Sequence, residues 1–264
     1  ALAVLSLTFP SVRREAKRTI DYLGTGLLAI GLSSIVLLTT LGGTTYDWLS
    51  PEIVGLGLIG VVALIAFARV EQNAEEPILP PHLFRNRVFV VTSALGFVVG
   101  FALFGSLTYL PLFQQVVRGL SPTESGLQML PLMGGLLIAS IGSGQIISRR
   151  GKYRIFPIFG TAIACVGLFL LSNIDSSISP GTMALYMAIL GFGLGLVMQV
   201  LVLAVQNAVS YSELGVATSG ATLFRSIGGS MGTAILGAIF ANRLATELAA
   251  KLPAGAPSEA GQGH

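Results

Sequence analysis

The sequence predicts an all-α membrane protein with about seven full transmembrane helices, and its composition is the first reason. Hydrophobic residues make up 53% of the 264 residues, charged residues make up only 10%, and the mean hydropathy is +0.80. A soluble domain carries about 25% charged residues. The second reason is that uncharged runs recur along the chain between short polar breaks. Crossing a bilayer takes about 20 residues, which most of these runs supply.

The apolar runs, of which only the last contains a charged residue, predict the helices in order along the chain. The expected spans are Tyr22 to Leu41, Ile53 to Phe67, Val88 to Leu110 continuing to Val117, Gly126 to Ile147, Ile155 to Leu171, Met183 to Ala208 and Val216 to Phe240. Before them, Ala1 to Phe9 is apolar but too short to cross a bilayer, and a basic loop follows it. The alternatives are the end of a signal peptide and the end of a span whose start is missing. The basic loop, in place of a small-residue cleavage site, favours the span, so we expect the chain to be a fragment.

The polar breaks divide the chain into five segments. We expect the end of a preceding span and a basic cytoplasmic loop at 1–21, a two-helix transmembrane hairpin at 22–70, a cytoplasmic linker at 71–87, a helical bundle at 88–241 and an external polar tail at 242–264. The linker is rich in Glu and Pro, and the tail is rich in Pro and Gly. A tail with so few large apolar residues does not predict a packed element.

The cations are distributed unevenly between the two sets of alternating loops. One set holds Arg13, Arg14, Lys17, Arg18, Arg69, Arg85, Arg87, Arg149, Arg150, Lys152 and Arg154, and the other holds only Arg118, Arg243 and Lys251. Lys and Arg are retained in the cytoplasmic loops of membrane proteins. The first set is therefore expected to be cytoplasmic, in a multi-pass protein of the cell membrane.

Several function classes are excluded by what the spans lack. The carboxylates lie in loops or at span ends, and the sequence has no zinc-protease, serine-hydrolase or P-loop motif, so we expect no enzyme and no cofactor. The single cysteine, Cys165, rules out an intramolecular disulfide and a metal site built on cysteines. The cations flank spans instead of forming one basic face, which argues against nucleic acid. His82 and His264 are expected to be isolated loop residues.

A few polar side chains fall inside the apolar runs and are the candidates for function. The candidates for a translocation path are Gln114, Gln115, Gln199, Thr222 and Arg225. Such groups either bond to a neighbouring helix or line a water-filled cavity, and the sequence leaves both open. Arg225 stands roughly 18 Å into its helix at 1.5 Å per residue, about halfway across the hydrocarbon. It is expected either to bond helix-end carbonyls or to line the path, where it would bind substrate or a carboxylate.

Two runs carry closely spaced glycines, which predict faces where helix backbones approach one another. These are Gly191, Gly193 and Gly195 in one run and Gly228, Gly229 and Gly232 in another.

The loop between the runs that end at Ile147 and begin at Ile155 carries a family resemblance. It reads Gly144-x-Ile-Ile-Ser-Arg149-x-Gly151-Lys152 and resembles the Gly-x-Leu-Ala-Asp-Arg-x-Gly-Arg loop of the major facilitator superfamily, with Ser148 in place of the usual Asp. Further stretches similar to its fourteen-span drug:proton antiporter branch are Tyr109 to Gln115, Gly126 to Pro131, Gln206 to Val209, Gly215 to Ser219 and Phe224 to Gly229.

The resemblance covers essentially the whole chain and implies a fold and a function. The hairpin at 22–70 is similar to the extra pair of spans inserted between the two halves of these exporters, and 88–241 would supply five of the six spans of the C-terminal half. The missing N-terminal half would hold the protonatable carboxylates. Gly144, Arg149, Gly151 and Lys152 would form a cytoplasmic hinge.

The implied activity is export of drug-like or amphipathic small molecules in exchange for protons, by alternating access of two bundles in the lipid bilayer. The alternatives are a major facilitator exporter of an endogenous metabolite or siderophore, and a transport-inactive membrane scaffold or sensor.

Overall fold

Among the residues that the computed structural model describes, seven helices are long and apolar enough to cross a membrane, as the sequence predicts. The structure describes residues 21–43, 45–74, 77–151, 153–175 and 177–251. Within these ranges the regular structure is helical, and the only β pairing is one isolated bridge between Gly42 and Tyr46. The predicted all-α membrane fold is confirmed.

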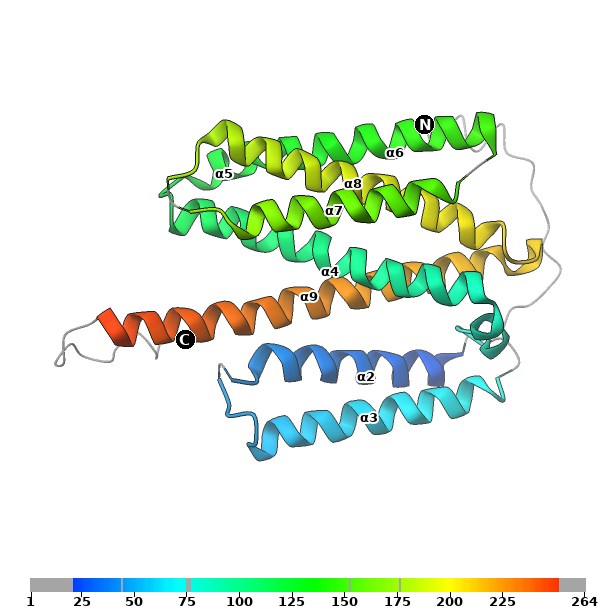
Figure 1. The fold of residues 1–264 in the computed structure, drawn as a ribbon. Helices are drawn as coiled ribbons and strands as arrows, with labels where there is room; N and C mark the ends of the chain where they lie inside the picture. Colours follow the sequence, from blue (N-terminus) through cyan, green and yellow to red (C-terminus); the bar gives the residue numbers. More distant parts are fainter. Residues whose placement is uncertain (1–20, 44, 75–76, 152, 176, 252–264) are drawn as a thin grey trace, which may run out of the picture.

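The long helices lie side by side and roughly parallel to one another (Figure 1). Their bounds are α2 Tyr22–Leu41, α3 Pro51–Glu71, α4 Arg87–Val116, α6 Leu130–Arg150, α7 Ile155–Ser172, α8 Pro180–Gln206 and α9 Leu214–Lys251. Three short helices complete the list: α5 Pro122–Gln128, which leads into α6, and the 3₁₀ turns η1 Pro81–Arg85 and η2 Tyr211–Glu213.

Helices begin earlier than their apolar runs wherever a serine is followed by a proline. Ser50, Ser121 and Ser179 each cap a helix by accepting a backbone N–H with the side chain, and the next residue is a proline. Proline has no N–H to leave unpaired and its backbone angle suits the first helical turn. The caps therefore decide these boundaries, and hydropathy alone places them too late.

The last helix also extends further than expected. Helix α9 continues past Phe240 to Lys251, so residues 242–251 of the expected tail are helical. This stretch contains Ala, Leu, Glu, Arg and Lys, which are good helix formers. The rest of the tail, 252–264, lies outside the described residues.

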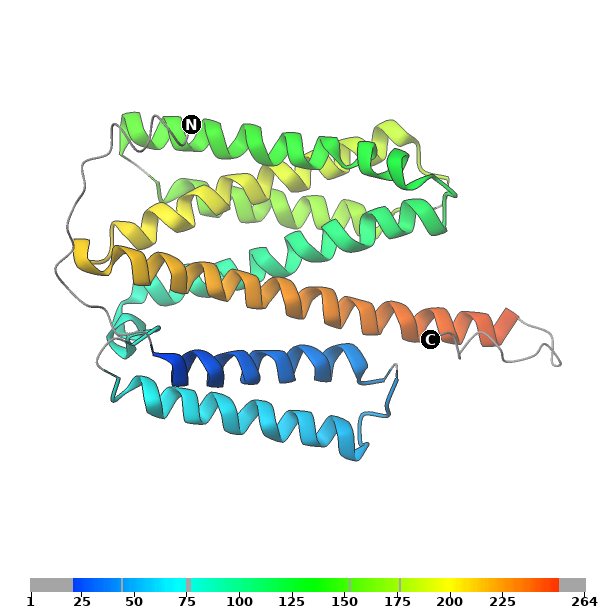
Figure 2. The same ribbon diagram turned by 180° about the vertical axis from the view of Figure 1, so that it is seen from behind.

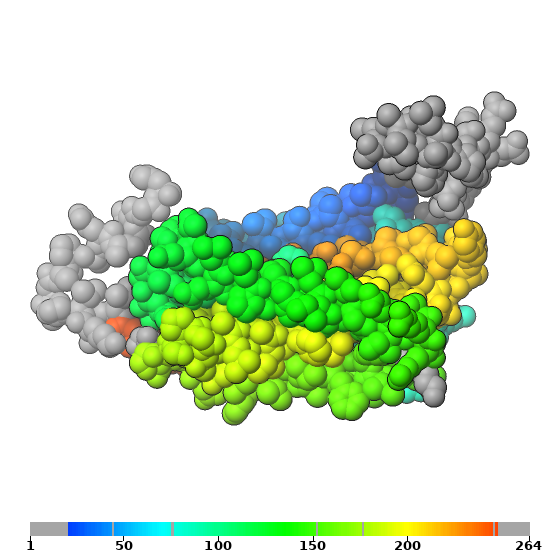
Figure 3. Space-filling model, turned by 90° about the horizontal axis from the view of Figure 1, so that it is seen from above, coloured from blue at the N-terminus to red at the C-terminus, as the bar shows by residue number. Residues whose placement is uncertain are grey.

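The core is centred on α8, which lies between α6 and α7. Its residues Met183, Met187, Leu190 and Val197 are fully buried, and Figure 3 shows α6 in green beside α8 in yellow. On the other side of the bundle α9 packs against α4, and the hairpin of α2 and α3 lies against α9 (Figures 1 and 2). The molecule is thus two tight helix layers with the hairpin added at one edge.

Glycines set the closest approaches in α8, as the sequence predicts. A Cβ atom on Gly191 would lie 2.0 Å from the carbonyl oxygen of Leu132 in α6, and one on Gly195 would lie 2.3 Å from that of Leu136. Gly193, on the opposite face, meets the backbone of Ala164 in α7. Backbones this close leave no room for a side chain.

Helix α9 uses its own glycines in the same way against α4. A Cβ atom on Gly228 would lie 2.0 Å from the carbonyl oxygen of Phe97, and one on Gly232 would lie 2.8 Å from that of Phe101. In both helix pairs, α4 with α9 and α6 with α8, glycines allow the two backbones to come into direct contact.

In the described part of the chain, the segments that carry the larger share of the cations come to one end of the bundle. The end of α3, η1, the start of α4, the end of α6 and the start of α7 lie together, at the right of Figure 1. The turn before α5 and the loop between α7 and α8 lie at the opposite end. The alternation inferred from the charges agrees with the fold, and the assignment of the basic end to the cytoplasm stays a prediction.

That assignment can be tested by labelling with a membrane-impermeant thiol reagent. Cys165 is exposed and must first be replaced. In that background of the full-length protein, we expect cysteine at Ser177 to label from outside the cell and cysteine at Ser148 to label only after the membrane is opened. Labelling of both positions from the same side would contradict the orientation.

Candidate functional site

Gln114 is buried in the contact between α4 and α8. Its side chain is 0% exposed, and its Nε2 atom lies 3.9 Å from the sulfur of Met183 and 4.0 Å from that of Met187. Its Oε1 atom has no hydrogen-bond partner in the described part of the chain. A buried amide with weak partners is costly, so this burial reduces the stability that the contact between α4 and α8 provides.

Gln115 has a structural partner. Its Nε2 atom donates to Oγ of Ser125 at 2.8 Å, and Ser125 lies in α5, which begins with a capping box between Ser121 and Glu124. Gln115 therefore fastens the end of α4 to α5. The structure favours the helix-bonding alternative for this residue over a place in the path.

Gln199 lies on an exposed part of α8. Its Oε1 accepts a long hydrogen bond of 3.4 Å from Oγ of Ser140 in α6, and its Cγ would lie 3.7 Å from a Cβ atom on Gly144. This places the path candidate Gln199 directly beside the first glycine of the expected hinge.

Thr222 belongs to an exposed hydroxyl stripe along α9. The stripe consists of Ser219, Thr222, Ser226 and Ser230, all exposed and spaced three or four residues apart. This spacing puts them on one face of the helix. Thr222 donates to the carbonyl oxygen of Thr218 at 2.9 Å, so its hydroxyl is satisfied within the helix. Ser226 and Ser230 were missed from sequence, although the spacing alone would have found them.

Arg225 lies at the contact between α9 and α4. A Cβ atom on Gly100 would lie 2.1 Å from its carbonyl oxygen and 3.1 Å from its Cγ, and the Cβ of Arg225 faces Gly96. The two glycines of α4 thus accommodate the backbone and stem of the arginine. The structure shows no hydrogen bond or ion pair to the guanidinium within the described ranges, so the bond to helix-end carbonyls is not observed there.

The loop that is expected to act as a hinge follows α6, which ends at a left-handed glycine. Gly151 has φ 69° and its N–H donates to the carbonyl oxygen of Ile147 at 2.8 Å. Residues with a Cβ rarely adopt this angle, which explains a glycine here. Arg149 is exposed in the last turn of α6, where a cation suits the negative end of the helix. Lys152 lies outside the described residues.

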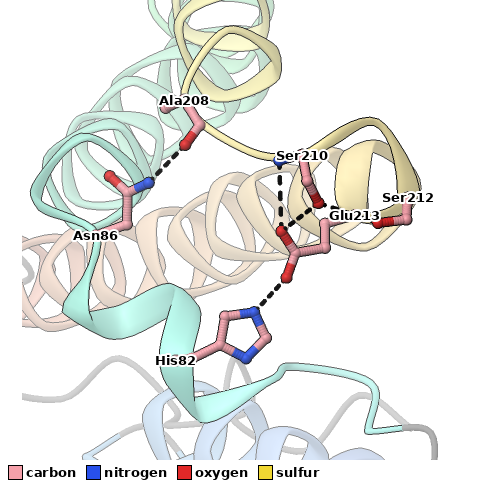
Figure 4. Close-up of polar contacts among 6 residues, drawn as sticks. All are labelled: His82, Asn86, Ala208, Ser210, Ser212 and Glu213. Atoms are coloured by element: carbon pink, nitrogen blue, oxygen red, sulfur yellow. Dashed lines mark hydrogen bonds and ion pairs between the residues drawn. The ribbon is translucent and has the colours of Figure 1, made fainter.

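A clamp at the basic end joins the linker to the loop between α8 and α9 (Figure 4). Nε2 of His82 lies 2.5 Å from Oε1 of Glu213, and Nδ2 of Asn86 donates to the carbonyl oxygen of Ala208 at 2.7 Å. Glu213 also accepts from Ser210. The expectation that His82 is an isolated loop residue is wrong, because its partner lies 131 positions away in sequence.

The linker is also held to the hairpin. The carboxylate of Glu71, at the end of α3, is 3% exposed and accepts the backbone N–H groups of Ile78 and Leu79 at 3.0 and 3.3 Å. The side chain of Leu79 in turn contacts α9, where it leaves no room for a Cβ atom on Gly220. The hairpin, the linker and α9 are therefore connected at this end.

None of the five path candidates lines a described cavity. The described cavities, of about 640, 310 and 400 Å³, lie along α4 and α7, among α4, α7 and α8, and along α6 and α7. Gln199, Thr222 and Arg225 instead lie on exposed or half-exposed surface. In the described part of the chain these three candidates are therefore open to contact from outside the bundle.

Comparison with known proteins identifies a family and several relatives of this chain. A family model described as Major Facilitator Superfamily matches residues 1–233. An uncharacterized MFS-type transporter of Mycobacterium tuberculosis is 47% identical over 97% of this chain and 37% of its own length. The multidrug transporter protein MdtP of Bacillus subtilis is 40% identical over 83% of this chain and 40% of its own length. A tetracycline resistance determinant of Streptomyces rimosus is 34% identical over 82% of this chain and 62% of its own length. The chain therefore spans only part of each of these relatives.

Proposed function

The chain belongs to the major facilitator superfamily, and from that premise we propose that the full-length protein exports drug-like or amphipathic small molecules in exchange for protons. The observation that carries the proposal is the 40% identity to a protein named as a multidrug transporter, together with the likeness to a tetracycline resistance determinant. The chain is then part of a transporter and not of an enzyme.

In this proposal the chain supplies one wall of the path. Two helical bundles rock about a site near the middle of the membrane, and 88–241 is part of the second bundle, with 22–70 as the inserted hairpin. The hydroxyl stripe of α9 and the exposed Gln199 would face the other bundle. We expect the protonatable carboxylates in a part of the transporter that this chain does not contain.

Among the candidates in this wall, Arg225 is the one that most needs a hydrogen-bond or ion-pair partner, because its guanidinium is charged. A cation in the middle of the hydrocarbon costs about 2.5–3.5 kcal/mol on insertion scales and faces protein or water. Because the described residues offer its guanidinium no partner, a substrate acceptor or a carboxylate of the other bundle is the natural one. Gln114 and Gln115 lie deeper in structural contacts and have a smaller part in the proposal.

The hinge at the basic end would control the rocking movement. Gly144 in α6 lies beside Gln199 in α8. A shift of α6 against α8 would therefore change the position of Gln199 relative to α6. We expect Arg149, Gly151 and Lys152 to contribute to the hinge, on the side expected to be cytoplasmic.

The test is drug efflux by the full-length protein in proteoliposomes. With a pH gradient imposed, we expect ethidium or tetracycline to move against its concentration, and we expect the movement to stop when the gradient is collapsed. The matched control is this chain expressed by itself, which should leave drug accumulation unchanged because alternating access needs two bundles. Movement that ignores the gradient, or efflux by the chain alone, would overturn the proposal.

A further inference from the structure

A cavity of about 310 Å³ opens at the basic end of the bundle, among α4, α7 and α8. It is lined at this end by Arg87, Tyr153 and Arg154, and farther along the helices by aliphatic side chains such as those of Val91, Leu95 and Val200. A cationic end on an apolar slot is the arrangement that an amphipathic anion requires. No function discussed above uses these residues.

Both of these arginines are available to a ligand. Arg87 and Arg154 are exposed, and the structure gives neither guanidinium a hydrogen bond or an ion pair within the described ranges. No carboxylate lines the cavity. The two positive charges are therefore not neutralised by the residues that surround them.

Two helix starts add to the positive potential at the same point. Helix α4 begins at Arg87, and α7 begins at Ile155, directly after Arg154. The residue that precedes α7 makes no side-chain hydrogen bond to its first turn, where the N–H of Phe156 donates to the backbone carbonyl oxygen of Tyr153 at 3.3 Å. Helix starts carry about half a positive charge and bind phosphate groups well.

The aliphatic side chains that line the cavity indicate that the rest of the ligand is apolar. Val91, Leu95 and Val200 would make no favourable contact with a free phosphate ion, whereas they suit a hydrocarbon chain. The helices around the cavity are membrane spans, so a lipid tail can reach it along the surface of α4.

We propose that this cavity binds an anionic phospholipid, with the phosphate at Arg87 and Arg154 and the start of one acyl chain against Val91 and Leu95. The cytoplasmic leaflet of cell membranes is rich in anionic lipids, and each Lys or Arg near its surface contributes about 1 kcal/mol to attraction. The site holds α4 to α7 at the end expected to be cytoplasmic. It does not depend on the substrate or on proton coupling.

The test is lipid titration of the full-length protein in detergent, read by native mass spectrometry. Phosphatidylglycerol should bind more tightly than phosphatidylcholine with the same acyl chains. Each charge removed should weaken phosphatidylglycerol about fivefold, so Arg87→Gln with Arg154→Gln should weaken it roughly thirtyfold. Arg87→Lys with Arg154→Lys should retain most of the affinity, because both positive charges are kept.

Two further arms separate the site from general attraction to a basic surface. Arg85→Gln with Arg150→Gln removes two exposed cations from the same end without touching the cavity, and should change the affinity less than twofold. Val91→Trp fills the slot and leaves every charge in place, and should still weaken phosphatidylglycerol. Equal loss in both arginine pairs, unchanged binding in Val91→Trp, or full competition by glycerol phosphate would overturn the proposal.

Discussion

Gly191→Ala should destabilise the full-length protein by about 3 kcal/mol or more, although it adds a single methyl group. The new Cβ would lie 2.0 Å from the carbonyl oxygen of Leu132 and 2.8 Å from its carbon. Both are backbone atoms of α6, so no rotamer change can relieve the overlap. The two helices would have to separate along their length, and the buried contacts of Leu190 and Leu194 with α6 and α7 would loosen with them.

The same helix provides the control for this substitution. Gly181 lies in the first turn of α8 with nothing within 4 Å of a built Cβ atom, so Gly181→Ala should leave stability unchanged or slightly raised, as alanine favours helix over glycine. The measurement is the fraction of protein that remains monodisperse after heating, by size-exclusion chromatography. If the two variants lost their monodisperse fraction at the same temperature, α6 and α8 would be able to separate at Gly191 more easily than the structure indicates.

Arg225→Met should lower proton-driven efflux by the full-length protein about tenfold to a hundredfold. A hydrogen bond to a charged group contributes about 1.5–3 kcal/mol, and losing it in the rate-limiting state slows turnover by these factors. Methionine keeps a stem that fits against Gly96 and Gly100 and removes the insertion cost of the charge. The amount of folded protein should therefore be retained.

Arg225→Lys tests whether the positive charge alone is sufficient, because lysine keeps the charge but lacks the guanidinium group. If the guanidinium contacts a substrate or a carboxylate across the path, Lys should keep part of the activity that Met loses. Efflux is measured in proteoliposomes and divided by folded protein from size-exclusion chromatography. Unchanged normalised efflux in Arg225→Met, with less folded protein, would assign the residue to helix packing and remove it from the path.

The fold could be predicted from the sequence because its main determinants are local. A bilayer forces each apolar run into a helix, and the seven spans follow from that constraint. Helix limits were less predictable, since the Ser-Pro caps at Ser50, Ser121 and Ser179 lie outside the apolar runs. The close glycine contacts were also predictable, because Gly191 and Gly228 occur in dense glycine clusters.

The contacts of individual polar groups could not be predicted in this way. Gln114 and Gln115 are adjacent and chemically identical, yet one is buried against sulfur atoms and the other bonds Ser125. Their partners depend on how α4 is rotated against α5 and α8, which hydropathy does not determine. The pairing of His82 with Glu213 joins distant parts of the chain and has no signature in either local sequence.

Helix α9 has the hairpin on one side, α4 on another and its row of hydroxyls on a third. The hairpin of α2 and α3 rests mainly on this one helix of the bundle. A larger residue in place of Gly220, Gly228 or Gly232 would meet Leu79, Phe97 or Phe101, so α9 has little room for larger side chains on the faces that it turns to its neighbours.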